Sequence, residues 1–140
     1  MVQKAASRVE EILSHGGRLM AAIVRARPSP SETEFVTPSD ANLQVGFVVK
    51  EAGSKVPRHR HHELTRRIVG TSEVLIVREG RCEIDVYDDE GTLIATRELQ
   101  ADDVVILVAG GHGIRMHEKT VFLEVKQGPY PGVEQEKEVF

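Results

Sequence analysis

The chain has 140 residues and a formal net charge of −4 at pH 7, from 18 basic and 22 acidic side chains. This length is that of one ordinary domain, and 40% hydrophobic with 29% charged residues is typical of a soluble, globular chain. The charge balance argues against a general nucleic-acid binder, and the longest apolar run, "VVILVA", is far below the ~20 residues of a membrane span.

The N-terminal part predicts a short helix. In "KAASRVEEILS", residues 4–14, Val9, Ile12 and Leu13 recur at helical spacing before "HGG" ends the segment. A signal-peptide apolar core is lacking and the single cysteine excludes an internal disulfide, so a cytoplasmic location is the default expectation. We expect residues 4–26 to form a helix or strand extension that ends at the loop "RPSPSETEFVTPSD".

From residue 43 onward the pattern becomes one of short strands separated by turn signals. The apolar and alternating runs are "LQVGFVVK", "EVLIVRE", "RCEIDVY", "LIATREL", "VVILVA" and "VFLEVK". Such runs without intervening helices predict an all-β antiparallel sandwich or barrel. We therefore expect one domain over 1–140, with its core over about 43–126 and a C-terminal tail over 127–140.

Alternation along these strands predicts which side chains face inward. In "RCEIDVY", Cys82, Ile84 and Val86 share one face, so the cysteine is predicted to be a buried core thiol. A reactive thiolate is the alternative, but no basic residue shares its face.

The densest group of histidines lies in "GSKVPRHRHHELTRR", residues 53–67. If this stretch is extended, His59 and His61 point to the same side, as two ligands of one metal would, whereas His62 points away. The alternative is a polar loop without a ligand.

Two further residues occur in inward-facing apolar rows. Glu73 shares a face with Leu75 and Val77, and a carboxylate there is costly unless it is paired, protonated or bound to a cation. His112 shares a face with Ile114 and Met116. Parity therefore selects one candidate metal-ligand set, which is His59, His61, Glu73 and His112.

At these residues the chain resembles the cupin superfamily, over about residues 43–126. Gly53, "SKVPR" and His59-Arg60-His61 are similar to the start of the first cupin motif, and Glu73, "VLIVRE" and Gly80 to its end. "ADDVVILVAGGHG" looks like the second motif, with Asp103 at its aspartate and His112 at its histidine. Eleven residues separate His61 from Glu73, where the family usually has three or four.

The resemblance implies an antiparallel double-stranded β-helix, the RmlC-like jelly-roll barrel. It also implies one divalent transition metal (Fe, Mn, Ni, Co, Cu or Zn) on His59, His61, Glu73 and His112. The ligand would be a small polar or anionic molecule, related to carbohydrate in the small bacterial cupins that this chain looks like. A homodimer is a further expectation from the family.

The sequence leaves open whether the protein is an enzyme. A metal-dependent oxygenase, isomerase or epimerase competes with a non-catalytic ligand-binding or regulatory protein. A metal-independent sugar-nucleotide epimerase is the third hypothesis, for which Tyr87 and Tyr130 are the only tyrosines. Arg66 and Arg67 are candidates to clamp an anionic substrate, and Met116 stands where the second motif usually has asparagine.

Overall fold

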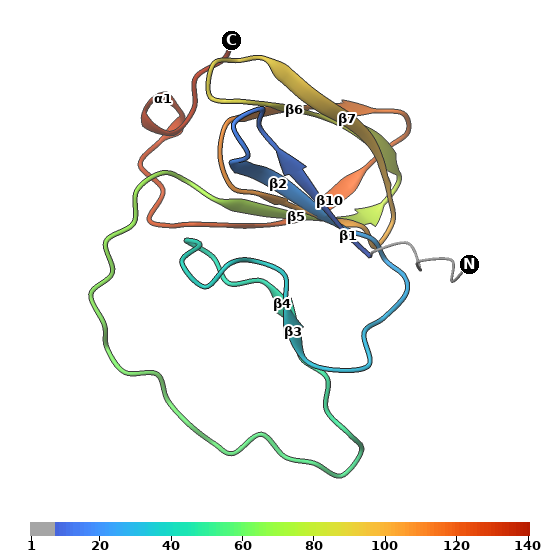
Figure 1. Ribbon diagram of the computed structural model, residues 1–140, viewed down its shortest axis with the longest axis vertical. Coiled ribbons are helices and arrows are strands. Elements are labelled where there is room, and N and C mark those ends of the chain that lie inside the picture. Colours follow the sequence, from blue (N-terminus) through green and yellow to red (C-terminus); the bar gives the residue numbers. More distant parts are fainter. Residues whose placement is uncertain (1–7) are drawn as a thin grey trace.

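The computed structural model describes residues 8–140 and shows an antiparallel β-sandwich (Figure 1). Within the described residues the chain forms strands that we label in chain order, followed by one short helix. Their bounds are β1 Val9–Leu13, β2 Leu19–Val24, β3 Glu34–Phe35, β4 Gly46–Phe47, β5 Glu73–Glu79, β6 Arg81–Tyr87, β7 Leu93–Gln100, β8 Val104–Leu107, β9 Gly111–Met116, β10 Val121–Lys126 and α1 Val133–Glu136.

Two sheets face each other across the core. The larger has the strand order β1-β2-β8-β5-β10 and the smaller has the order β7-β6-β9. Every pairing is antiparallel. Among the described residues β9 pairs only with β6 and β10 only with β5, and at the other side β1 and β7 likewise have one partner each, so no backbone pairing joins the two sheets. We call the side of β9 and β10 the open side. The expected all-β class is thus confirmed, whereas no closed barrel forms within residues 8–140.

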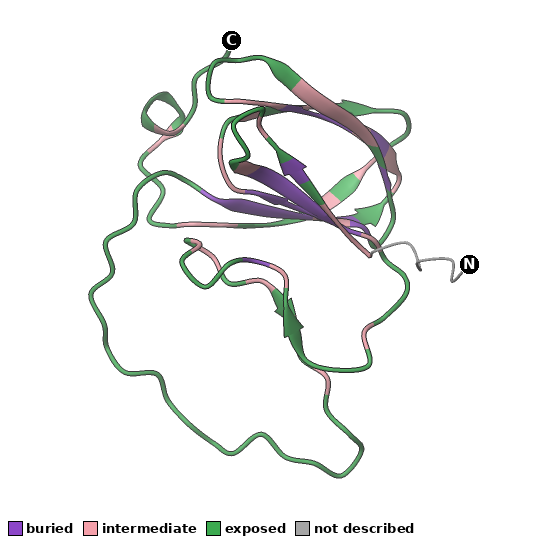
Figure 2. Cartoon of the chain, in the orientation of Figure 1, coloured by how far each residue is buried: buried purple, intermediate pink, exposed green. Residues whose placement is uncertain are grey.

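The core consists of inward side chains from both sheets. Cys82, Ile84 and Val86 of β6 are at most 1% exposed, as the alternation predicts, and the thiol is free and buried. They pack against apolar residues of β2, β5 and β8 such as Ile23, Val77 and Val105, and Figure 2 shows buried stretches along the larger sheet. Burial raises the pKa of the Cys82 thiol, which opposes thiolate chemistry there.

A smaller apolar layer covers the outer face of the larger sheet. Ala22, Val24, Val74 and Ile106 point outward from β2, β5 and β8, and residues around the β3–β4 pair, including Val45 and Phe47, pack on them. This layer explains why β2, β5 and β8 carry apolar side chains on both faces.

The prediction of a helix over residues 4–14 is wrong for residues 8–14, which the structure describes. Residues 9–13 form β1, which pairs with β2 through a turn in which Gly17 has φ 83°. Ser14 N–H donates to the Arg18 carbonyl at 2.8 Å and closes this hairpin. β-Branched Val9 and Ile12 suit a strand, and pairing with β2 overrides the helical spacing of the apolar residues. Residues 4–7 of the predicted helix lie outside the described residues.

The predicted strand over 43–50 is reduced to Gly46–Phe47, and the long segment after it has no regular structure. We call residues 50–68 the arm. Each of its residues is exposed, and in Figure 1 it leaves the sandwich as one long excursion before the chain enters β5. The strands predicted at 73–79, 81–87 and 121–126 form with the expected bounds. No helix within residues 8–140 has the length and apolar content required to cross a membrane.

Candidate functional site

Glu73 is a buried carboxylate at the start of β5. It shares the inward face with Leu75 and Val77, yet it is only 9% exposed. A carboxylate in that position carries a desolvation penalty unless a partner or a proton neutralises it. The sequence-based prediction that Glu73 faces the interior is confirmed.

His112 reaches Glu73 from the opposite sheet. It lies on β9, paired with Val86, and its Nε2 is 3.3 Å from Oε2 of Glu73. A third of its side chain remains exposed, so the ring can be approached from solvent. Burial, and then the positive charge of Lys137, lower the pKa of His112 and favour the neutral imidazole.

A second carboxylate, Glu124, shares this end of the sandwich. It lies opposite Leu75 in the β5–β10 pair, on the same face of the sheet as Glu73, and it remains exposed. Burial, and then the hydrogen bond and negative charge of Glu124, raise the pKa of Glu73 to about 7. The same hydrogen bond lowers the pKa of Glu124, since the protonated Glu73 carboxyl donates to it. Below about pH 7 the two carboxyl groups thus share one proton, which they lose as the pH rises through this value.

Two lysines border these carboxylates. Lys126 is paired with Glu73 across the β5–β10 ladder, and its Nζ lies 3.4 Å from Oε1 of Glu136 in α1. The positive charge of Lys137, at the end of α1, acts on Glu73 and Glu124. We call Glu73, His112, Glu124, Lys126 and Lys137 the mouth cluster.

The C-terminal tail, residues 127–140, passes beside the mouth cluster. After α1, the Phe140 ring packs edge-on against Tyr87 at 5.3 Å between centroids. It also lies against Gly111, where an added Cβ would come within 2.6 Å of the ring. The tail therefore connects Lys126, at the end of β10 in the larger sheet, with Gly111, which precedes His112 in the smaller sheet.

Three residues of this cluster were not predicted from the sequence. Glu124 and Lys126 lie two and four residues after Phe122, which packs against the core, so all three side chains share one face of β10. The parity that identified Glu73 could therefore have predicted this face. Lys137 follows a four-residue helix that no sequence pattern indicated.

The arm carries the other two predicted ligands. The rings of His59 and His61 are 5.2 Å apart between centroids, in an edge arrangement. Nδ1 of His59 is 2.9 Å from the Pro57 carbonyl oxygen. When Nδ1 carries the proton and donates it to this oxygen, the lone pair on Nε2 is available to bind a metal. Both residues are exposed.

The structure thus presents the predicted ligands as two separate pairs, one on the arm and one in the mouth. Within residues 8–140, no group of three or more His, Cys, Asp or Glu side chains is close enough together to hold a metal ion. The donor types nevertheless fit a divalent transition metal, since three imidazoles and one carboxylate are its common protein ligands. The mouth pair, moreover, places a buried carboxylate against an imidazole.

The remaining candidates lie at the surface. Arg66 and Arg67 are exposed on the arm, as is His62. Met116 is 54% exposed at the end of β9 opposite to His112. Tyr130 is 58% exposed, with its ring 5.1 Å from Nζ of Lys126.

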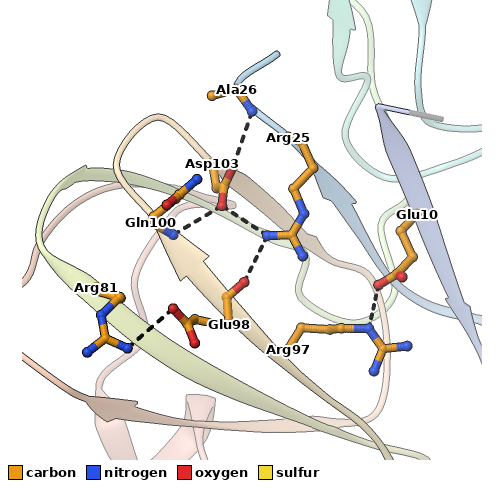
Figure 3. Close-up of polar contacts among 8 residues, drawn as sticks. All are labelled: Glu10, Arg25, Ala26, Arg81, Arg97, Glu98, Gln100 and Asp103. Carbon is orange, nitrogen blue, oxygen red and sulfur yellow. Dashed lines mark hydrogen bonds and ion pairs between the residues drawn. The ribbon is translucent and has the colours of Figure 1, made fainter. Parts of the chain in front are cut away.

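Asp103, the aspartate of the second motif, has a structural role. It is 1% exposed and accepts hydrogen bonds from Arg25 Nη1 at 2.9 Å, the Gln100 amide at 3.0 Å and the Ala26 amide at 3.1 Å (Figure 3). These bonds join the end of β2 to the β7–β8 turn. A cavity of about 220 Å³ adjoins them, but the Asp103 carboxylate is already satisfied.

Comparison with known proteins finds no match to a protein-family model, to a curated protein or to a solved structure. Any assignment of function therefore depends on the residues of this chain alone.

Proposed function

We propose that this protein binds one divalent transition metal between the arm and the mouth cluster, and that it binds or transforms a small anionic molecule there. The observation that carries the proposal is the contact between Glu73 and His112, 3.3 Å apart on strands of opposite sheets. A desolvated carboxylate whose pKa is raised to about 7 gains most from a cation that replaces its proton.

The arm supplies the second half of the proposed site. His59 and His61 lie on one extended stretch and have their rings side by side. Addition of this stretch to the unpaired edge of β9 would bring the two rings toward His112 and close the open side of the sandwich. The closed form is the cupin-type double-stranded β-helix that the sequence motifs imply.

The charges near the mouth favour an anionic ligand. Lys126 and Lys137 border the carboxylates, and the arm brings Arg58, Arg60 and Arg66 with its histidines. Guanidinium and ammonium groups bind carboxylate or phosphate oxygens. A bound divalent metal would act as a Lewis acid on a ligand oxygen. A carbohydrate acid or a sugar phosphate has the required groups.

A metal titration tests the proposal. We expect purified wild-type protein to bind one Co²⁺ per chain by calorimetry, with the visible absorption of a nitrogen and oxygen ligand set. His59→Ala/His61→Ala should weaken binding on the order of 100-fold or more, because losing even an outer-shell partner costs about 10- to 100-fold.

The matched control is His15→Ala/His62→Ala, which removes two histidines outside the proposed set and should bind as the wild type does. Circular dichroism establishes that each variant is folded. Equal Co²⁺ affinity in both double variants, or no binding by the wild type, would reject the proposed site.

A second candidate function is metal-independent proton transfer by Glu73 and His112. The observation that favours it is the pKa of Glu73 at about 7, which suits a general acid or base at neutral pH. In D₂O with EDTA, the wild type would then exchange the proton next to the carbonyl of a keto sugar nucleotide, and Glu73→Gln would not. Absence of exchange in the wild type excludes this alternative.

A further inference from the structure

The arm makes almost no contact with the rest of the described chain. All of its residues are exposed, and its ends are fixed by hydrogen bonds between Thr33 and Val49 and from Asn42 Nδ2 to the Val69 carbonyl. Fully extended and anchored at both ends, nineteen residues reach roughly 30 Å from the sandwich. That distance is sufficient to contact a second molecule.

The charge of the arm is opposite to that of the remainder of the chain. Six basic and two acidic side chains give residues 50–68 a formal charge of +4. Because the whole chain carries −4, everything outside the arm carries −8. An arm of one copy is therefore attracted to the body of another.

The open side of the sandwich offers the arm a place to bind. β9 and β10 follow one another in the chain, lie in different sheets, and each leaves its outer edge without a partner among residues 8–140. Unpaired edges bind an added strand through backbone hydrogen bonds. β10 also presents Val121, Leu123 and Val125, each at least 39% exposed, and the arm presents exposed Val56 and Leu64.

The direction of the arm favours a second copy over its own β9. In Figure 1 the arm lies beyond the β3–β4 pair, on the side of the larger sheet away from the smaller sheet that contains β9. Its two anchors hold it there. The same direction presents the arm to a neighbouring molecule.

We propose that two copies exchange arms, so that His59 and His61 of one copy complete the mouth cluster of the other. The exchange is reciprocal and gives a two-fold dimer with two equivalent sites. This inference rests on the proposed metal site, and it adds that each site is composite and incomplete in an isolated chain.

Complementation between two defective variants tests the exchange. His59→Ala/His61→Ala has a defective arm and an intact mouth, whereas Glu73→Gln/His112→Ala has an intact arm and a defective mouth. Co-expression with two different affinity tags gives a heterodimer in which one site regains all four ligands. At a Co²⁺ concentration that just saturates the wild type, we expect neither variant alone to bind the metal, and the purified heterodimer to bind one Co²⁺ with wild-type absorption.

The two ways in which this test can fail are distinguishable. If the wild type binds one Co²⁺ per chain but the heterodimer binds none, the sites are intramolecular and the exchange is overturned while the proposed function remains. If the wild type binds no Co²⁺, the proposed function itself is overturned. Sedimentation adds a test that does not depend on metal, since the wild type should be a dimer and a chain with residues 55–67 replaced by a short Gly/Ser linker a monomer.

A charge substitution on the arm tests the attraction between copies while all four proposed metal ligands are retained. Arg60→Glu on the arm should weaken the dimer about tenfold or more at low salt. Arg27→Glu makes the same charge change on the negatively charged body and should not weaken the dimer. Equal dissociation constants for these two variants would overturn the exchange.

Discussion

The smaller sheet and the arm use similar numbers of residues in opposite ways. β6 buries Cys82, Ile84 and Val86 completely or nearly so, and each pairs through the backbone with β7 and β9. The arm buries none of its residues. The free energy of folding therefore comes from the sandwich, and the histidines and arginines of the arm are available for binding.

The first prediction separates the two regions by stability. Ile84→Ala should lower the free energy of unfolding by about 2–5 kcal/mol, because it removes a fully buried side chain and leaves a cavity. Leu64→Ala on the arm is the control and should change it by less than about 0.5 kcal/mol. Urea unfolding measures the free energy of unfolding of each variant. EDTA and high salt in the buffer keep the arm from binding to the mouth cluster. Similar losses for the two variants would show that the arm is part of the core.

The second prediction concerns Glu73 in metal-free protein. Its folded pKa of about 7 exceeds its ordinary value of 4.5, so the folded state binds more protons between these values. The stability that this contributes is present at low pH and is lost as pH rises through about 7. We expect the free energy of unfolding to fall by roughly 1–3 kcal/mol between pH 5 and 8. The lowered pKa of Glu124 acts in the opposite direction and reduces the change.

Glu73→Gln should remove that dependence and raise stability at pH 8, whereas Glu63→Gln on the exposed arm serves as the control. Chemical denaturation in EDTA across the pH range is the measurement. A pH dependence that persists in Glu73→Gln would assign the proton uptake to another group.

The sequence was sufficient to predict the position of several strands. β5, β6 and β10 form with the predicted bounds, and the shared inward side of Glu73 and the core residues follows from a period of two. β1 was predicted as a helix because Val9, Ile12 and Leu13 recur at helical spacing. In the strand Val9 and Ile12 pack in different apolar clusters, and pairing with β2 decides the conformation.

The site was predictable only in part. Parity places Glu73 and His112 in the interior, but their contact depends on how the two sheets face each other, which no local pattern specifies. Parity also applies to Glu124, but no sequence motif distinguishes this carboxylate from the others in the chain. The arm has no alternation against a core, so its sequence indicates which residues it offers but not where they bind.

The most direct test of the composite site is whether metal joins the arm to the mouth. Trypsin cleaves after Arg58 and Arg60, both exposed on the arm, and docking of the arm should remove these sites from the protease. We predict that Co²⁺ slows cleavage there about tenfold or more in the wild type and has no effect in Glu73→Gln/His112→Ala. Unchanged cleavage in the wild type with Co²⁺, or equal protection in the mouth variant, would contradict a site shared between the arm and the mouth cluster.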